Sequence, residues 1–389
     1  MEDFVEALVN GEREAQIKAA IDISELKSNQ RKMLGIDHDV DIIINRLVSM
    51  LCSQDYNAIQ ASVLALISFA SGNDRNKIRI AKSGCLPVLI GLLTDETGSF
   101  EELAIVVLLT LSSCKANKLA IAASGVVPVL LELLSRDDEG IGCNYSLQTR
   151  LDAIDTLHNL STCQELILSV ISSGTVFSLL QLIYKSNKSS KLVEKAMALL
   201  ETIASSSEIG VAQIGGAEGG ILALVETIES SASQQSGEHA AEVLLFICKS
   251  CREKYRELIL REGAIPGLLQ LRVDGTRRAK DTARTLLLLL KDSSNYGTRS
   301  RQLKNRFFER VMRGIDSDEE KLAQTTMRLF KPCESQGLSN KAFRQSQTTR
   351  VLQSKGGREV YTEGNKCAKT KSDFPRLYKG AGDRSNNYR

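Results

Sequence analysis

The sequence predicts an all-α solenoid, in which short helical repeats stack on one another along the chain. An eleven-residue phrase with a Gly, a Pro slot and paired apolar residues recurs five times, as SGCLPVLIGLL, SGVVPVLLELL, SGTVFSLLQLI, EGGILALVETI and EGAIPGLLQLR. Its glycines, Gly84, Gly125, Gly174, Gly219 and Gly263, lie 41, 49, 45 and 44 residues apart, a period typical of helical repeats. The chain has no Trp and only 5% aromatic residues, so aliphatic helix-on-helix packing is expected.

Each repeat is predicted to hold three helices, as the stretch from residue 100 to 134 illustrates. Apolar residues at helical spacing predict a helix that ends near Ser112, and a shorter helix follows and stops at Gly125. Glycine suits that end because a left-handed backbone turn carries no side-chain penalty there. Pro128 falls in the first turn of the next helix, where its missing N–H has no intrahelical partner anyway. The unit is a short, a medium and a long helix, which is the armadillo pattern.

The helical units can be followed in order along residues 1–292. Residues 4–28 form a partial N-terminal unit, and residues 41–71 form a repeat without the Gly and Pro. Five further repeats follow, and the last of them ends with the helix of residues 279–292. Because one repeat cannot cover its own apolar face, neighbours must stack. We therefore predict a right-handed armadillo superhelix of about six repeats, a helical C-terminal cap at 293–331 and a disordered basic tail at 332–389.

Charge divides the chain into two parts. Residues 1–292 hold 29 Lys and Arg against 37 Asp and Glu, whereas residues 293–389 hold 21 against 10. A solvated extension is the expected role of the basic part, with RNA or anionic membrane as alternative contacts. The first residues are acidic without an apolar leader, and nine cysteines show no regular spacing, which favours a cytoplasmic or nuclear protein with reduced thiols.

Two segments resemble the armadillo domains of the plant U-box family. They are DTLHNLSTC at 155–163 and ILREGAIPGLLQLRVDGTRRAKDTARTLLLLLKD at 259–292, and the resemblance extends over about residues 41–292. A U-box, which in that family recruits the ubiquitin-conjugating enzyme, is not recognisable in these residues. The resemblance therefore implies a plant protein that acts as an adaptor or scaffold, with a ubiquitin link as an expectation.

The long third helices of armadillo proteins line a concave groove, which in importin-α holds a basic peptide through repeated Trp and Asn. Alignment of the third helices fills the Trp slot with Leu64, Val106, Asp155, Ala198, Val243 and Arg284. It fills the Asn slot with Ser68, Thr110, Asn159, Thr202, Ile247 and Leu288. One Asn and no Trp argue against a nuclear-import receptor.

The same alignment gives a candidate binding surface. Its middle part consists of four polar residues on one helical face at i, i+4, i+7 and i+11, which are Gln148, Asp152, Asp155 and Asn159. Its far end is mostly basic and consists of Arg277, Lys280, Asp281 and Arg284. Such a groove would orient an extended segment with a basic part and an acidic part. The alternative is that these are ordinary solvated helix faces.

Motifs for catalysis are not found. His38, His158 and His239 lie in different repeats, and the glycine cluster at 215–220 lacks the Lys-Ser/Thr of a phosphate loop. We expect no enzyme activity, cofactor, metal or small-molecule substrate. The sequence predicts a protein-interaction scaffold that binds a partner in its groove, with association to RNA or anionic membrane through the tail as the alternative.

Overall fold

The computed structural model describes residues 2–26, 30, 39–95, 100–135, 146–230, 233–291, 310 and 313–317. All of them lie in one compact unit, Met1–Asp318. The expected disordered tail lies outside the described residues, as does most of the expected C-terminal cap. Every regular element in the described ranges is a helix, which confirms the predicted fold class.

The helices follow the predicted order of short, medium and long. The N-terminal pair is α1 (Glu2–Asn10) and α2 (Arg13–Glu25). The first helices of the repeats are α6 (Asp74–Lys82), η2 (Lys115–Asn117) with α9 (Lys118–Ala123), α12 (Ile167–Ser172), α15 (Glu208–Gly216) and α18 (Arg252–Arg261). The second helices are α4 (Val40–Leu51), α7 (Cys85–Leu93), α10 (Val126–Ser135), α13 (Thr175–Lys185), α16 (Gly220–Glu229) and α19 (Ala264–Asp274). The third helices are α5 (Tyr56–Ala70), α8 (Glu101–Ser112), α11 (Leu147–Ser161), α14 (Lys191–Ser206), α17 (Gln234–Ser250) and α20 (Arg277–Leu290).

The recurring glycine turns the chain from the first helix of a repeat into the second. All five glycines of the phrase have positive φ, between 71° and 87°, as predicted for a left-handed turn. A Cβ at Gly125 would meet no atom within 4 Å, so backbone conformation and not space selects glycine there. Pro128 lies in the first turn of α10, which confirms its predicted place.

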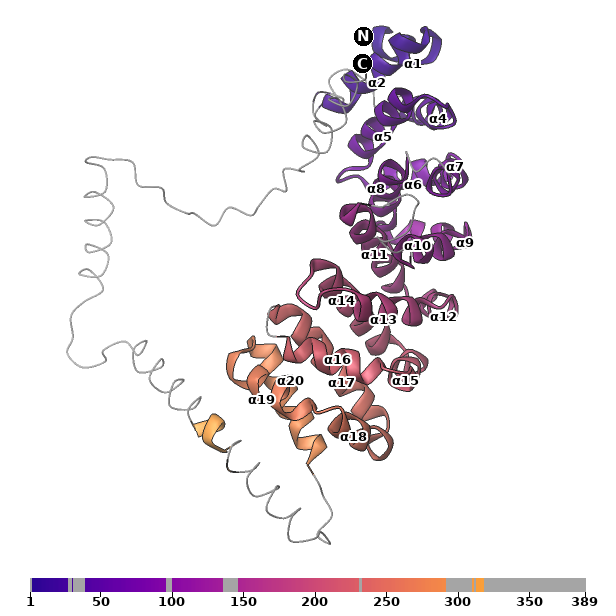
Figure 1. Cartoon of the computed structure of the whole chain (residues 1–389). Helices are drawn as coiled ribbons and strands as arrows, with labels where there is room; N and C mark the ends of the chain where they lie inside the picture. The colour runs from indigo at the N-terminus through magenta and orange to yellow at the C-terminus, as the bar shows by residue number, and fades with distance from the viewer. Residues whose placement is uncertain are drawn as a thin grey trace, which may run out of the picture. The chain divides into compact units, whose positions relative to one another are not determined.

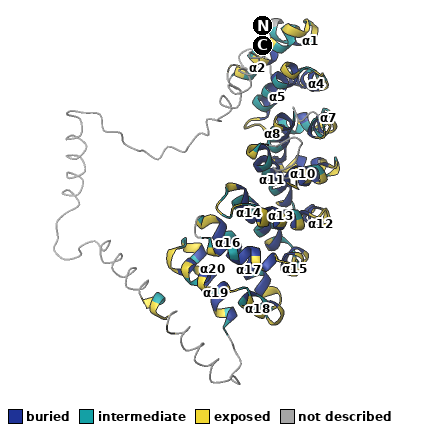
Figure 2. Cartoon of the chain, viewed as in Figure 1, coloured by how far each residue is buried: buried dark blue, intermediate teal, exposed yellow. Residues whose placement is uncertain are grey.

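The helices form two layers along the array. In the upper part of Figure 1, α5, α8, α11 and α14 follow one another along one side, with α4, α7, α10 and α12 along the other. Consecutive third helices pack against each other from α5 to α20. Figure 2 shows the buried residues where neighbouring helices meet, and many of them are Leu, Ile, Val and Ala. Burial of one such Leu stabilises the fold by about 1.5–3 kcal/mol.

Side-chain caps mark the starts of several third helices. Four of them begin at a Ser or Thr whose side chain accepts a hydrogen bond from a backbone N–H three residues on: Ser146, Ser190, Ser233 and Thr276. These caps fix where α11, α14, α17 and α20 start.

No single helix in the described ranges is long and apolar enough to cross a membrane, and the two helix pairs that together reach that length are bent by 110° and 85°.

Candidate functional site

The predicted residues of α11 lie on one side of the helix, and each contacts a neighbour. Gln148 Nε2 donates a 2.6 Å hydrogen bond to Asp152 Oδ1. Both carboxylate oxygens of Asp155 lie 2.6 Å from Lys195 Nζ of α14. Asn159 Nδ2 donates to Ser112 Oγ of α8 at 2.9 Å. This face of α11 is therefore bound to the helices before and after it.

Asp152 corrects one part of the prediction. Helical spacing places it beside Gln148 and Asp155, but it is only 6% exposed, so it does not present a free carboxylate to the groove. Burial raises its pKa to about 6, a rise that the hydrogen bond from Gln148 opposes and the charge of Asp155 increases. Asp152 is thus a desolvated carboxylate within the array.

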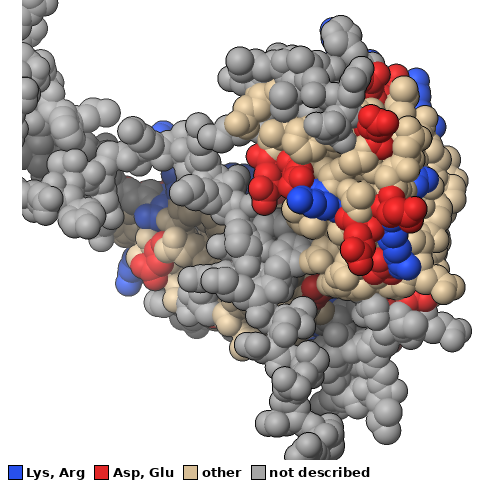
Figure 3. All heavy atoms as spheres, turned by 90° about the horizontal axis from the view of Figure 1, so that it is seen from above, with Lys and Arg blue, Asp and Glu red and all other residues tan. Residues whose placement is uncertain are grey.

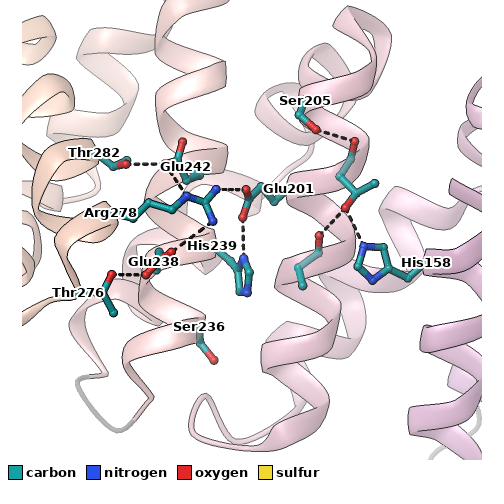
Figure 4. A network of polar contacts seen from close by, with 12 residues as sticks. His158, Glu201, Ser205, Ser236, Glu238, His239, Glu242, Thr276, Arg278 and Thr282 are labelled. Atoms are coloured by element: carbon teal, nitrogen blue, oxygen red, sulfur yellow. Dashed lines mark hydrogen bonds and ion pairs between the residues drawn. The ribbon is translucent and has the colours of Figure 1, made fainter. Parts of the chain in front are cut away.

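A second polar cluster joins α14, α17 and α20, and we name it the three-helix network: Glu201, Glu238, His239, Glu242 and Arg278 (Figure 4). Arg278 of α20 forms ion pairs with three glutamates. Its Nη2 contacts Glu201 Oε1, its Nη1 lies 3.2 Å from Glu238 Oε1, and its Nε lies 3.4 Å from Glu242 Oε1. His239 Nδ1 lies 2.6 Å from the other oxygen of Glu201.

Threonine hydroxyl groups donate further hydrogen bonds to two of these glutamates. Thr276 donates to Glu238, and Thr282 Oγ1 donates to Glu242 Oε1 at 2.5 Å. Burial alone would raise the pKa of Glu201, but hydrogen bonds from His239 and Arg278 outweigh it, and the net shift is downward. Glu201 is therefore held as the anion at neutral pH.

A shallow cavity of about 490 Å³, widely open to solvent, lies next to this network, between α17 and α20. Its lining residues are Glu242, Leu245, Arg277, Arg278, Asp281, Thr282 and Thr285. Two of them, Arg277 and Asp281, were predicted from the sequence, and both side chains are exposed. Lys280 is half-buried and is not part of the lining, whereas Arg284 is exposed and lies 3.5 Å from Asp316. We name the exposed surface of α14, α17 and α20 around this cavity the groove face.

The sequence alignment does not find the three-helix network because it places the third helix α17 one residue out of register. Val243 and Ile247, which were assigned to the groove, are fully buried, while Glu242 and Phe246 are partly exposed. One residue corresponds to about 100° of rotation around a helix. The spacing of Glu238, Glu242 and Phe246 at i, i+4 and i+8 is the sequence signal that identifies the correct face.

The groove face carries both acidic and basic side chains, among them Glu242, Arg277, Arg278 and Asp281. Figure 3 views the molecule from above, and acidic and basic side chains are interspersed among uncharged residues on that side as well. Within the described ranges, no group of three or more His, Cys, Asp and Glu residues is placed to hold a metal ion. Burial lowers the pKa of His158. Its Nε2 lies 2.8 Å from Thr202 Oγ1, so this contact joins α11 to α14.

Comparison with known proteins identifies the repeat type. A sequence profile of the plant U-box protein ARM repeat region matches residues 144–306. U-box domain-containing protein 45 of Arabidopsis thaliana is 29% identical over 262 residues, which cover 67% of this chain and 32% of that protein. The chain thus spans about a third of the length of this relative.

Solved structures share the fold. A crystal structure of an engineered protein is 20% identical with a TM-score of 0.63, covering 91% of this chain and 88% of that one. A designed armadillo repeat protein in complex with the peptide (KR)4 is 21% identical with a TM-score of 0.55, covering 64% and 99%. The chain has the armadillo-repeat fold, and its repeats resemble the armadillo region of plant U-box proteins.

Proposed function

We propose that this chain is a non-enzymatic protein-interaction scaffold that binds an extended segment of a partner protein on its groove face. The armadillo fold supports a protein-binding repeat scaffold. The observation that carries the proposal is the cavity between α17 and α20, whose rim holds the exposed charges Arg277 and Asp281. A designed armadillo repeat protein solved with the peptide (KR)4 supports a peptide as the ligand.

The groove face is ordered before binding, and its charges can select the direction in which such a ligand lies. The three-helix network ties α14, α17 and α20 together before a partner arrives, so less conformational freedom is lost on binding. Opposite charges at Arg277 and Asp281 would select the direction in which a segment lies, since like charges brought together oppose binding.

The similarity to U-box domain-containing protein 45 supports an adaptor role in ubiquitin-related signalling. We place this role in the cytoplasm or the nucleus because of the sequence, whose nine cysteines show no regular spacing. The excess of basic residues after residue 292 supports a second candidate, an association with RNA or anionic membrane. Deletion of residues 332–389 separates the two. Binding of RNA or anionic vesicles should be lost in this variant if the tail carries it, and a groove-bound partner should be retained.

Affinity purification with the full chain tests the groove directly. Reversal of two exposed charges, Arg277→Glu with Asp281→Lys, should remove a partner that the wild-type chain retains. The matched control reverses two exposed charges elsewhere, Lys115→Glu with Glu165→Lys, and should retain that partner. A partner that both double variants retain equally would show that the groove face does not bind it.

A further inference from the structure

A carboxylate from the C-terminal extension contacts the last repeat at two arginines. Asp316 Oδ1 lies 2.9 Å from Arg272 Nη2 at the end of α19, and Asp316 Oδ2 lies 3.5 Å from Arg284 Nη2 of α20. The single carboxylate therefore bridges two helices. We name Arg272 and Arg284 the arginine pair.

The two arginines differ in exposure. The side chain of Arg272 is 4% exposed, whereas that of Arg284 is 51% exposed and that of Asp316 is 35% exposed. A buried guanidinium is stable only with anionic or hydrogen-bonding partners, and Arg284 adds a second charge at the surface. The arginine pair thus has one buried cation that a carboxylate contacts at 2.9 Å and one exposed cation that a ligand can reach.

The contacting segment is short. Residues 313–317 are helical, and Arg313, Gly314 and Ser317 are exposed, while Ile315 and Asp316 are half-buried. Asp316 forms the two ion pairs with the last repeat, and the apolar Ile315 beside it is half-buried. A carboxylate of another segment could take the place of Asp316 in these ion pairs.

The arginine pair continues the groove face. Arg284 follows Asp281 by three residues on α20 and precedes Thr285, and Asp281 and Thr285 both line the cavity. A segment that lies in the cavity can thus extend to Arg284 within about one helical turn of α20.

We propose that the arginine pair is the docking site for a short acidic segment of a partner protein, in which an apolar residue precedes a carboxylate, and that Ile315 and Asp316 occupy this site in the free chain. The inference rests on the proposed function, because it names the chemistry of the segment bound on the groove face. A tethered occupant acts at an effective concentration in the millimolar range, so a partner segment must displace it. Binding in trans is then weakened until Asp316 leaves.

Fluorescence anisotropy with the full chain tests this competition, and the probe is a labelled peptide RGIDSDEE, the sequence of residues 313–320. Asp316→Asn removes the internal carboxylate and should strengthen peptide binding at least about fivefold relative to wild type. Adding Arg284→Glu to that variant should weaken binding at least about tenfold. Arg284 is chosen over Arg272 because its exposed side chain allows substitution without opening the core.

Two controls make the result specific. Asp274→Asn removes an exposed carboxylate at the end of α19 and should leave the affinity at the wild-type level. The peptide RGINSDEE, which lacks the first carboxylate, should bind several times more weakly to the Asp316→Asn variant than RGIDSDEE does. Equal affinity of wild type and Asp316→Asn for RGIDSDEE, or unchanged affinity after Arg284→Glu, would overturn the proposal.

The outcome is separable from that of the proposed function. If peptide binding behaves as stated while the Arg277 and Asp281 reversal leaves the cellular partner bound, the arginine pair stands and the cavity assignment fails. If the reversal removes the partner but the peptide shows no competition, the arginine pair fails alone. An Asp316-dependent dimer in light scattering would also overturn the proposal, because the occupant would then be a second copy of the chain.

Discussion

Asp152 of α11 and Glu201 of α14 lie on adjacent third helices, and both carboxylates are withdrawn from solvent. The pKa of Asp152 is raised to about 6, whereas the pKa of Glu201 is lowered. Burial opposes ionisation at both positions, so the difference comes from their partners. Asp152 receives a neutral amide donor from Gln148, while Glu201 receives Arg278 and His239.

The comparison shows that direct contact with Arg278 and His239 outweighs burial at Glu201, whereas the charge of Lys195, which contacts Asp155, does not outweigh burial at Asp152. Arg278 is 77 residues from Glu201 in sequence and crosses α17 to reach it. The contacts of Asp155 and Asn159, by contrast, extend only to the adjacent third helices. The last three repeats are therefore joined as one polar unit, and the cavity lies within that unit.

Removal of the shared cation should have the largest effect. Arg278→Ala leaves three largely buried glutamates without their arginine, and we expect a loss of about 2 kcal/mol in the free energy of unfolding. This value is below that of a fully buried pair because half of the Arg278 side chain is exposed. Urea unfolding followed by circular dichroism measures it.

Arg277 provides the matched control for this substitution. It is the preceding residue on α20 and is exposed. Arg277→Ala should change the free energy of unfolding by less than about 0.5 kcal/mol. Equal losses in the two variants would mean that the three-helix network does not stabilise the array.

Substitution of Asp152 should change how the free energy of unfolding depends on pH. Asp152 binds its proton more tightly in the folded chain, so it stabilises the fold below its ordinary pKa of 3.8, and this contribution is lost as pH rises through about 6. Between about pH 7.5 and pH 5, wild type should gain about 1.4 kcal/mol relative to Asp152→Asn. Urea unfolding at both pH values gives this difference.

An exposed carboxylate serves as the reference for that titration. Asp274→Asn should follow the wild-type pH dependence, since Asp274 is exposed at the end of α19. A pH dependence of Asp152→Asn that parallels wild type would show that Asp152 is not the group with the raised pKa.

The pair of Asp155 and Lys195 should give the smallest effect. Their side chains are about 30% exposed, so solvent screens the attraction. We expect Lys195→Ala to lower the free energy of unfolding by about 0.5 kcal/mol, and the loss should shrink in 1 M NaCl. A loss as large as that of Arg278→Ala would remove the distinction between the two parts of the groove.

The sequence was sufficient for the fold because the signals of the fold are local. A Gly at positive φ and a Pro three residues later specify a turn and a helix start without reference to distant residues. The shared face of Gln148, Asp155 and Asn159 was also predictable, since spacing within one helix fixes direction. The burial of Asp152 and the reach of Arg278 were not, because they depend on how neighbouring helices rotate and pack.

The central claim is that the partner binds on the groove face and not on the second helices of the repeats, such as α13. Photo-crosslinking from p-benzoylphenylalanine in the full chain tests it, with one variant substituted at Thr285 in the cavity and one at Tyr184 of α13. Tyr184 is 72% exposed, so it offers an equally accessible position on a second helix. We expect a defined crosslinked protein, identified by mass spectrometry, from position 285 and none from position 184. Adducts from position 184 alone would contradict the claim.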